Sequence, residues 1–420
     1  MIVLDQENKI FTLHTQNTTY QMKVDQYHVL EHIYYGARID NRDLSGLIKC
    51  GERSFSPNPD EAGRNRDYSL DVMPQEYSTC GVGDFRLPSI ELELPGGSHT
   101  ADLRYEGFHL ERGKYKLEGL PGFHGMENEA ETLVVLLKDS AARIAVEMYY
   151  GVFEDFDLIT RAIRLVNEGT ETIRVCRCAS LCLDFTRSDL DLITFNGHHL
   201  MERCLDRGPV RPGIQSVGSV RGISSHQHNP FVMICDHDAD EDRGMCYGAM
   251  LLYSGNFEAA VECSQYENSR LVMGIHPYHF CWTLEPAGTF TAPETAMVCS
   301  PDGFGQMSRQ YHKAIRKHLL RDPYQYERKP VLVNNWEATY FDFDADKLVD
   351  IAREAADLGI ELFVMDDGWF GSRNDDNSGL GDWQVNREKL PGGLEALVPC
   401  VKDLGMKFGI WMEPEMVNED

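Results

Sequence analysis

The chain has 420 residues, of which 42% are hydrophobic and 25% charged, so it can bury a large core in two or more domains. Its 67 acidic and 40 basic residues give a formal net charge of -27, which argues against nucleic acid or an anionic membrane surface as a partner and favours a neutral substrate. The amino terminus carries Asp5 and Glu7 where a secretion signal needs basic residues, and no long apolar run follows. We therefore expect a cytoplasmic protein.

Strands and turns alternate over residues 1–302, with almost no sustained helical periodicity, which predicts a large all-β sandwich domain. Within it, the run RAIRLV, a turn containing Gly169 and the alternating run IRVCRCASLCLDF predict a β-hairpin over residues 161–185. Cys176, Cys178 and Cys182 fall at even spacing in that second run, on one face of the strand. We interpret them as buried reduced thiols rather than metal ligands.

Residues 53–88 are different, because they are rich in Pro, Gly, Asn and Arg and show no clear period. Loops of this length in compact proteins tend to be functional or disordered. Aromatic and basic residues such as Phe55, Tyr68, Tyr77 and Arg86 predict an ordered segment. We favour packing against the sandwich and keep a contribution to a binding site as the alternative.

A helical pattern over residues 305–320 ends in basic residues, which suit the carboxyl end of a helix dipole. We assign residues 303–329 to a helical linker and residues 330–420 to a second domain. There, three apolar runs near residues 331, 361 and 407 are separated by helical patterns at 345–359 and 394–404, each ending at a glycine, Gly359 or Gly405. This alternation is typical of βα units on a parallel sheet.

Acidic and aromatic residues follow each of these apolar runs. Trp336, Asp366, Asp367 and Trp411 would share one cavity, since the carboxyl ends of barrel strands meet at one face. Indole faces beside carboxylate acceptors suit a polyhydroxylated ligand such as a sugar, so we interpret these four residues as substrate-binding. Barrel packing remains the alternative for the two tryptophans, and helix capping for the acids.

Two further acidic pairs are weaker candidates. Glu413 and Glu415 alternate in WMEPEMV and are expected side by side on one strand, which fits a hydrogen-bond network better than a catalytic pair flanking one bond. Asp375 and Asp376 lack the bidentate Glu of a calcium loop, and no His joins the acids at useful spacing. We therefore predict no metal and no other cofactor.

The runs DDGWF, GDWQVNREKLPGGLEALV and GIWMEPEMV, together with MPQEYSTCGVGDFRLP and RAIRLVNEGTE, resemble the family 36 glycoside hydrolases. These are bacterial α-galactosidases of the melibiase and raffinose-cleaving type, and the resemblance covers essentially the whole chain. It implies an amino-terminal β-supersandwich followed by a (β/α)₈ TIM barrel, of which residues 330–420 supply the first three βα units. It also implies that Asp366 and Asp367 bind the O4 and O6 hydroxyls of the terminal galactose and that Trp336 and Trp411 help to wall that subsite.

The resemblance further implies retaining hydrolysis of terminal α-D-galactosyl residues in galactosides such as melibiose and raffinose, and a homotetramer at full length. A barrel needs eight strands, and the family's nucleophile and acid/base belong to later strands, so we expect a truncated chain that is inactive by itself and assign it no catalytic residue. The alternative is a non-catalytic or vestigial galactose-binding fragment. The sequence does not distinguish galactose from N-acetylgalactosamine as the preferred sugar, or hydrolysis from transglycosylation as the reaction.

Overall fold

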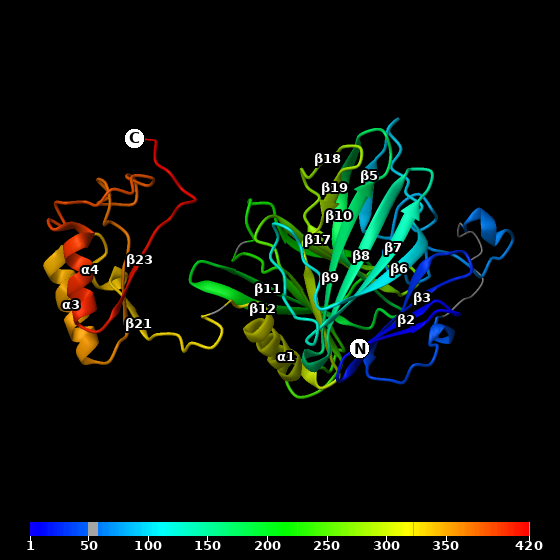
Figure 1. The fold of residues 1–420 in the computed structure, drawn as a ribbon, viewed down its shortest axis with the longest axis horizontal. Helices are drawn as coiled ribbons and strands as arrows, with labels where there is room; N and C mark the ends of the chain where they lie inside the picture. The colour runs from blue at the N-terminus through cyan, green and yellow to red at the C-terminus, as the bar shows by residue number, and fades with distance from the viewer. Residues whose placement is uncertain (49–57, 225, 322, 420) are drawn as a thin grey trace. The chain divides into compact units, whose positions relative to one another are not determined.

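The computed structural model describes residues 1–48, 58–224, 226–321 and 323–419. These residues form two compact units, Met1–Arg321 and Asp322–Asp420, each described by itself (Figure 1). The first unit is rich in β-strands and the second is α/β, as predicted. The finer domain limits, with a separate linker at 303–329, stay a prediction.

Strands β1 to β20 form antiparallel sheets in the first unit. One sheet contains β1 (Ile2–Asp5), β2 (Ile10–His14), β3 (Thr18–Val24) and β4 (Leu30–Ala37), in that order. A second has the order β13 (Gly213–Ser219), β16 (Phe257–Cys263), β17 (Ser269–Ile275), β10 (Ile173–Phe185) and β18 (Trp282–Leu284), with β5 (Ile90–Glu93) paired to β10.

The third sheet has the order β12 (Met201–Pro209), β11 (Asp191–His198), β14 (Phe231–Cys235), β15 (Cys246–Leu251), β20 (Thr295–Ser300), β9 (Leu158–Asn167), β8 (Ile144–Phe153), β7 (Glu131–Asp139) and β6 (Arg104–Arg112), with β19 (Thr289–Thr291) paired to β9. Short 3₁₀ turns lie at Ser45–Leu47, Asp60–Ala62 and Glu154–Phe156.

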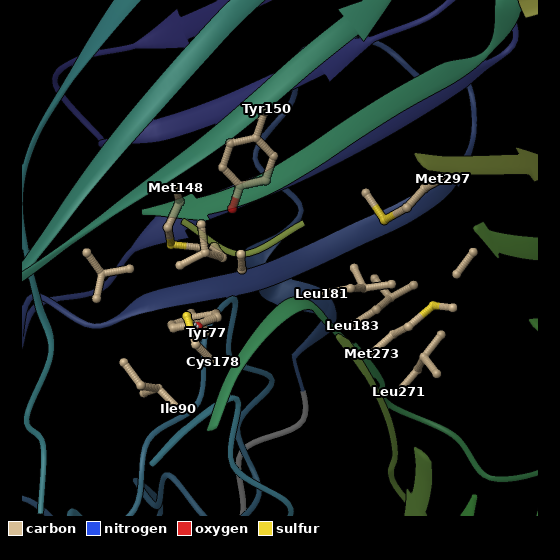
Figure 2. Packing of buried hydrophobic residues seen from close by; sticks show 14 of the residues in the cluster. Tyr77, Ile90, Met148, Tyr150, Cys178, Leu181, Leu183, Leu271, Met273 and Met297 are labelled. Carbon is tan, nitrogen blue, oxygen red and sulfur yellow. Dashed lines mark hydrogen bonds between the residues drawn. The ribbon is translucent and has the colours of Figure 1, made fainter. Parts of the chain in front are cut away.

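A shared hydrophobic core joins these sheets. Met148 and Tyr150 of β8 belong to one buried cluster with Leu181 of β10 and Leu271 of β17 (Figure 2). Side chains that alternate along each strand supply this core, which is how a sheet buries one face against another.

The predicted hairpin over residues 161–185 is wrong. β9 pairs with β8, β19 and β20, whereas β10 pairs with β5, β17 and β18, so the two runs lie in different sheets. Asn167 Nδ2 donates to the carbonyl of Glu171 within the turn at 2.8 Å and to that of Leu284, outside the turn, at 3.0 Å. The connection therefore crosses between sheets.

Residues 58–88 are ordered and packed, and residues 53–57, including Phe55, lie outside the described residues. Buried Glu76 accepts hydrogen bonds from Arg161 at 2.8 Å and from the hydroxyls of Tyr20 at 2.5 Å and Tyr150 at 2.7 Å. A second buried set, here called the core ion cluster, comprises Asp84, Arg86, Asp184 and Arg270. These pairs anchor the segment to the strands of the first unit, as the packing interpretation predicted.

Helix α1 (Gly303–His318) confirms the predicted helix. It packs within the first unit through Met307, Tyr311 and Ala314. Its basic last turn contains Arg316, Lys317 and His318. Across the described residues, none of the helices has the length and apolar character that crossing a membrane requires.

The second unit alternates strands and helices: β21 (Leu332–Asn334), α2 (Trp336–Thr339), α3 (Ala345–Asp357), β22 (Leu362–Met365), α4 (Gly393–Asp403) and β23 (Lys407–Ile410). The strands are parallel in the order β21, β22, β23. Phe363 and Met365 on β22 pack with Leu348 of α3 and Leu397 of α4 in one core. The sequence pattern thus correctly predicted the βα alternation; closure into an eight-stranded barrel stays a prediction.

Candidate functional site

The three parallel strands place their carboxyl ends at one edge of the sheet, and the predicted site residues follow those ends. Asn335 and Trp336 come after β21, Asp366 and Asp367 after β22, and Trp411 after β23. Ligands of open parallel sheets and barrels bind at this edge because the loops there are free to carry polar groups.

Asp366 is held from three sides. Its Oδ2 accepts a hydrogen bond from Nδ2 of Asn334, and its Oδ1 accepts one from the backbone N–H of Asp367 at 2.7 Å. Its own N–H donates to Oδ1 of the fully buried Asn335 at 2.8 Å. The carboxylate is half-buried, and each oxygen retains a lone pair for a further donor such as a hydroxyl.

Asp367 forms a buried ion pair with Arg373. Arg373 donates from Nε to both carboxylate oxygens, at 2.7 and 2.9 Å, and from a terminal nitrogen to Oδ2 at 2.8 Å. The side chains of Arg373 and Asp367 are 4% and 7% exposed, and the hydrogen bonds to Asp367 raise the pKa of Arg373. Asp367 thus fixes the loop after β22.

Lys389 lies behind this pair. Its Nζ donates to the carbonyls of Phe341 at 2.8 Å and Gly368 at 3.0 Å. Burial lowers the pKa of Lys389, partly offset by the negative charges of Asp367 and Asp342. Lys389 therefore connects the loop that carries Asp367, at Gly368, to the backbone at Phe341.

The tryptophans differ in their surroundings. Trp336 begins the short helix α2 instead of ending a strand, because its N–H donates to Oδ1 of Asn334 at 2.7 Å and turns the chain. Asn334 thereby links Trp336 to Asp366. Trp336 is half-buried against Tyr340 and Phe341, with ring centroids 5.2 and 5.0 Å apart in edge-to-face contact.

Trp411 extends the sheet by one hydrogen bond, since its N–H donates to the carbonyl of Met365 at 2.9 Å. Its half-buried ring lies nearly parallel to Phe370, with 6.5 Å between centroids. Trp369 donates its indole N–H to the carbonyl of Trp411 at 2.9 Å and packs on Trp383.

Glu413 and Glu415 do not share a strand, contrary to the prediction, because β23 ends at Ile410. Pro414 lies between the two acids, lacks an N–H and restricts the backbone of Glu413. Burial and the charge of Glu415 raise the pKa of Glu413, which also interacts with Arg373 and Asp367. Glu413 therefore lies near the site edge with a carboxyl that is more easily protonated than usual.

Asn334, Asn335, Arg373 and Lys389 were missed from the sequence. The adjacent asparagines directly after an apolar run gave a usable signal, because asparagine commonly terminates strands and caps turns. Arg373 and Lys389 lie in a loop without periodicity, where the sequence does not reveal partners. Within the described ranges, no three His, Cys, Asp or Glu side chains are grouped so that they could hold a metal ion.

Family models match nearly the whole chain. The model of the glycosyl hydrolase family 36 N-terminal domain matches residues 28–285, and the melibiase model matches residues 289–420. The chain has a β-rich unit followed by an α/β unit with acids and indoles at its strand ends. Together with these matches, this architecture defines a glycoside hydrolase. The chain belongs to glycosyl hydrolase family 36. This confirms the resemblance drawn from the motifs.

Several relatives are α-galactosidases. The bifunctional α-galactosidase/sucrose kinase AgaSK of Mediterraneibacter gnavus is 47% identical over 419 residues, covering 100% of this chain and 45% of the relative. The α-galactosidase AgaA of Geobacillus stearothermophilus is 43% identical over 420 residues, covering 99% of this chain and 57% of the relative. The chain thus spans about half the length of the curated relatives it matches.

Solved structures share the fold. The galactosidase domain of AgaSK superimposes with a TM-score of 0.97 at 47% identity, covering 100% of this chain and 58% of that one. A variant of AgaA solved in complex with raffinose gives a TM-score of 0.94 at 43% identity, covering 97% of this chain and 57% of that one.

Proposed function

We propose that the protein carrying this chain is an α-galactosidase that hydrolyses terminal, non-reducing α-D-galactosyl residues in galactosides such as melibiose and raffinose. The observation that carries the proposal is Asp366, a half-buried carboxylate fixed by Asn334 and by the N–H of Asp367 at the carboxyl ends of the parallel strands. The names of the relatives and the raffinose complex of AgaA support this substrate class.

Each site residue has a distinct role in the proposal. The free lone pairs of Asp366 accept sugar hydroxyl protons, and the geometry of its fixed carboxylate selects one arrangement of hydroxyls. Asp367 accepts from a neighbouring hydroxyl while Arg373 holds it. Trp336 and Trp411 provide indole surface against the C–H groups of the sugar.

Residues 1–420 supply recognition and not turnover in this proposal. Retaining hydrolysis needs a nucleophile and an acid/base with carboxyls about 5 Å apart across the bond. We assign both to strands beyond the three described here, because the relatives are about twice as long as this chain. A galactose-binding fragment without turnover is the second candidate.

Asp366→Asn in the full-length enzyme tests the recognition role. A carboxylate that accepts a hydroxyl hydrogen bond contributes about 1.5–3 kcal/mol, so kcat/KM on an aryl α-galactoside should fall by roughly 10- to 100-fold. Asp376→Asn, which changes an exposed acid in the following loop, serves as the control and should leave kcat/KM unchanged. An unchanged kcat/KM for Asp366→Asn at equal Tm would rule out the assignment.

Activity of purified residues 1–420 tests the division of roles. We expect no turnover of the aryl α-galactoside by this piece. Turnover within roughly tenfold of the full-length enzyme would instead require a catalytic pair within residues 1–420.

We also propose a cytoplasmic homotetramer for the full-length protein. Light scattering at micromolar concentration should give the mass of four chains. A fully active monomer would contradict the tetramer.

A further inference from the structure

Cys176 and Cys281 lie where the pairing of β10 with β18 ends. β10 and β18 pair in antiparallel register, with Arg174 opposite Thr283 and Val175 opposite Trp282. The next step of this register places Cys176 opposite Cys281, which directly precedes β18. Directly opposed residues of antiparallel strands have Cα atoms about 4.5 or 5.5 Å apart, within the roughly 4.4–6.8 Å that a disulfide spans.

The two thiols are free, interact and can be reached. Cys176 is half-buried and Cys281 is exposed. The Cys281 thiol is among the groups that raise the pKa of Cys176, so the two side chains lie near each other. By contrast Cys235 and Cys246, which are also directly opposed, are each 0% exposed.

A β-bulge in the pairing of β10 with β5 lies at Cys176. The register between β10 and β5 shifts between Val175 and Arg177, which leaves Cys176 as the extra residue. An extra residue in a bulge has no partner in the ladder and its side chain can be re-aimed. Cys176 interacts with Cys281, Glu93 and Arg174, so its side chain lies near these groups.

Arg174 makes the two thiols unequal. Its Nε donates to Sγ of Cys281 at 2.9 Å, and Glu93 holds the guanidinium at 3.2 Å. A cation that donates to the sulfur offsets the negative charge of an attacking thiolate. Burial, followed by the nearby thiol of Cys281 and the charge of Glu93, raises the pKa of Cys176. Cys281 is thus suited to attack first and Cys176 to attack second.

We propose that Cys176 and Cys281 form a redox-active pair that reacts with hydroperoxides and closes to a cross-strand disulfide. The Cys281 thiolate attacks a peroxide oxygen, so that an S–O bond forms, the O–O bond breaks and the released hydroxide takes up a proton. The Cys176 thiol, losing its proton, then attacks the sulfenic sulfur and displaces a second hydroxide, which that proton converts to water. Two thiols are oxidised while one hydrogen peroxide is reduced to two water molecules.

Peptide mapping after peroxide treatment tests the proposal. The protein is exposed to hydrogen peroxide, its remaining thiols are alkylated, and tryptic peptides are read by mass spectrometry without reduction. We expect a peptide pair joined through Cys176 and Cys281, reversible by dithiothreitol, with Cys235 and Cys246 still reduced. Oxidation confined to other cysteines, or chains joined to each other through Cys281, would overturn the proposal.

Matched variants assign the roles. Cys281→Ser should abolish the linked peptide, whereas Cys204→Ser and Cys400→Ser, which change exposed cysteines elsewhere, should leave it unchanged. Arg174→Gln should slow its formation by roughly threefold or more, because the thiolate loses its cation. An unchanged rate in Arg174→Gln, or a rate equally slowed in Cys204→Ser, would contradict the role of Arg174.

Discussion

Arg373 is the residue on which the position of Asp367 depends most directly. Removing one partner of a buried ion pair leaves the other charge uncompensated, which costs about 3–5 kcal/mol. Arg373→Gln should therefore lower the free energy of unfolding of the second unit by about 3 kcal/mol, measured by denaturant titration, and should also weaken sugar binding.

An exposed arginine provides the control for this prediction. Arg387 pairs with Glu395 at 3.7 Å on the surface, so Arg387→Gln should cost less than about 1 kcal/mol. Asp367→Asn combined with Arg373→Gln should be less destabilising than the sum of the single changes, since both charges are then absent. Additive effects would show that the two side chains do not act as a pair.

Glu31 should give the first unit a measurable pH dependence. It is 4% exposed, and burial and the charge of Asp25, only partly offset by Lys23, raise its pKa from 4.5 to about 8. The folded state holds this proton more tightly than the unfolded chain. The stability contributed by neutral Glu31 is therefore complete below pH 4.5 and is lost as pH rises through 8.

The corresponding experiment measures the free energy of unfolding at several pH values for the parent and for Glu31→Gln, which stays neutral. The free energy of unfolding of the parent should fall relative to the variant by on the order of 4 kcal/mol between pH 4.5 and 8. Glu118→Gln, an exposed control, should follow the parent. Parallel pH curves for the parent and Glu31→Gln would contradict the prediction.

Part of the site could be predicted residue by residue. Asp366 and Asp367 follow an apolar strand, so their place at its carboxyl end depends only on local pattern. The partner of Asp367 could not be predicted, because Arg373 reaches it through a loop shaped by Gly371 and Gly379, whose φ angles are 49° and 81°. Sequence periodicity carries no information on such conformations.

At the scale of single elements, the end of α3 offers a clean test. Gly359 has a φ of 82°, and a methyl group added there would meet no other atom within 4 Å. Any cost of a substitution is therefore backbone strain. Gly359→Ala should destabilise the second unit by about 1 kcal/mol, and Gly359→Asn by less, because asparagine tolerates the left-handed region. Equal losses in Tm for the two variants would argue against this cap.

Helices α3 and α4 were predictable because their contacts repeat locally and a glycine, Gly359 or Gly405, follows the end of each. The pairing of β9 was not. Both runs of the expected hairpin have the right composition, yet strand partners are chosen by contacts distant in sequence, such as that of Asn167 with the carbonyl of Leu284. Turn length and the alternation of apolar and polar residues indicate a strand, but they do not determine which sheet the strand joins.

At the scale of the whole molecule, the division into two units predicts where proteases cut. Tyr324 and Tyr326, near the boundary after Arg321, are 62% and 76% exposed. Chymotrypsin should first release a resistant fragment of roughly the first 320 residues, seen by gel and mass spectrometry. Tyr324→Ser combined with Tyr326→Ser should delay that cut, and first cleavage at exposed Phe85 would contradict the prediction.

The core ion cluster bears on the order in which the first unit folds. Arg270 reaches Asp84 across 186 residues of sequence and Asp184 across 86. Contacts this distant close large loops, and they can form only after the sheets that carry them have assembled. Interactions completed after the rate-limiting step slow unfolding without accelerating folding. Residues 58–88 should therefore determine how long the folded unit persists and have little influence on how quickly it forms.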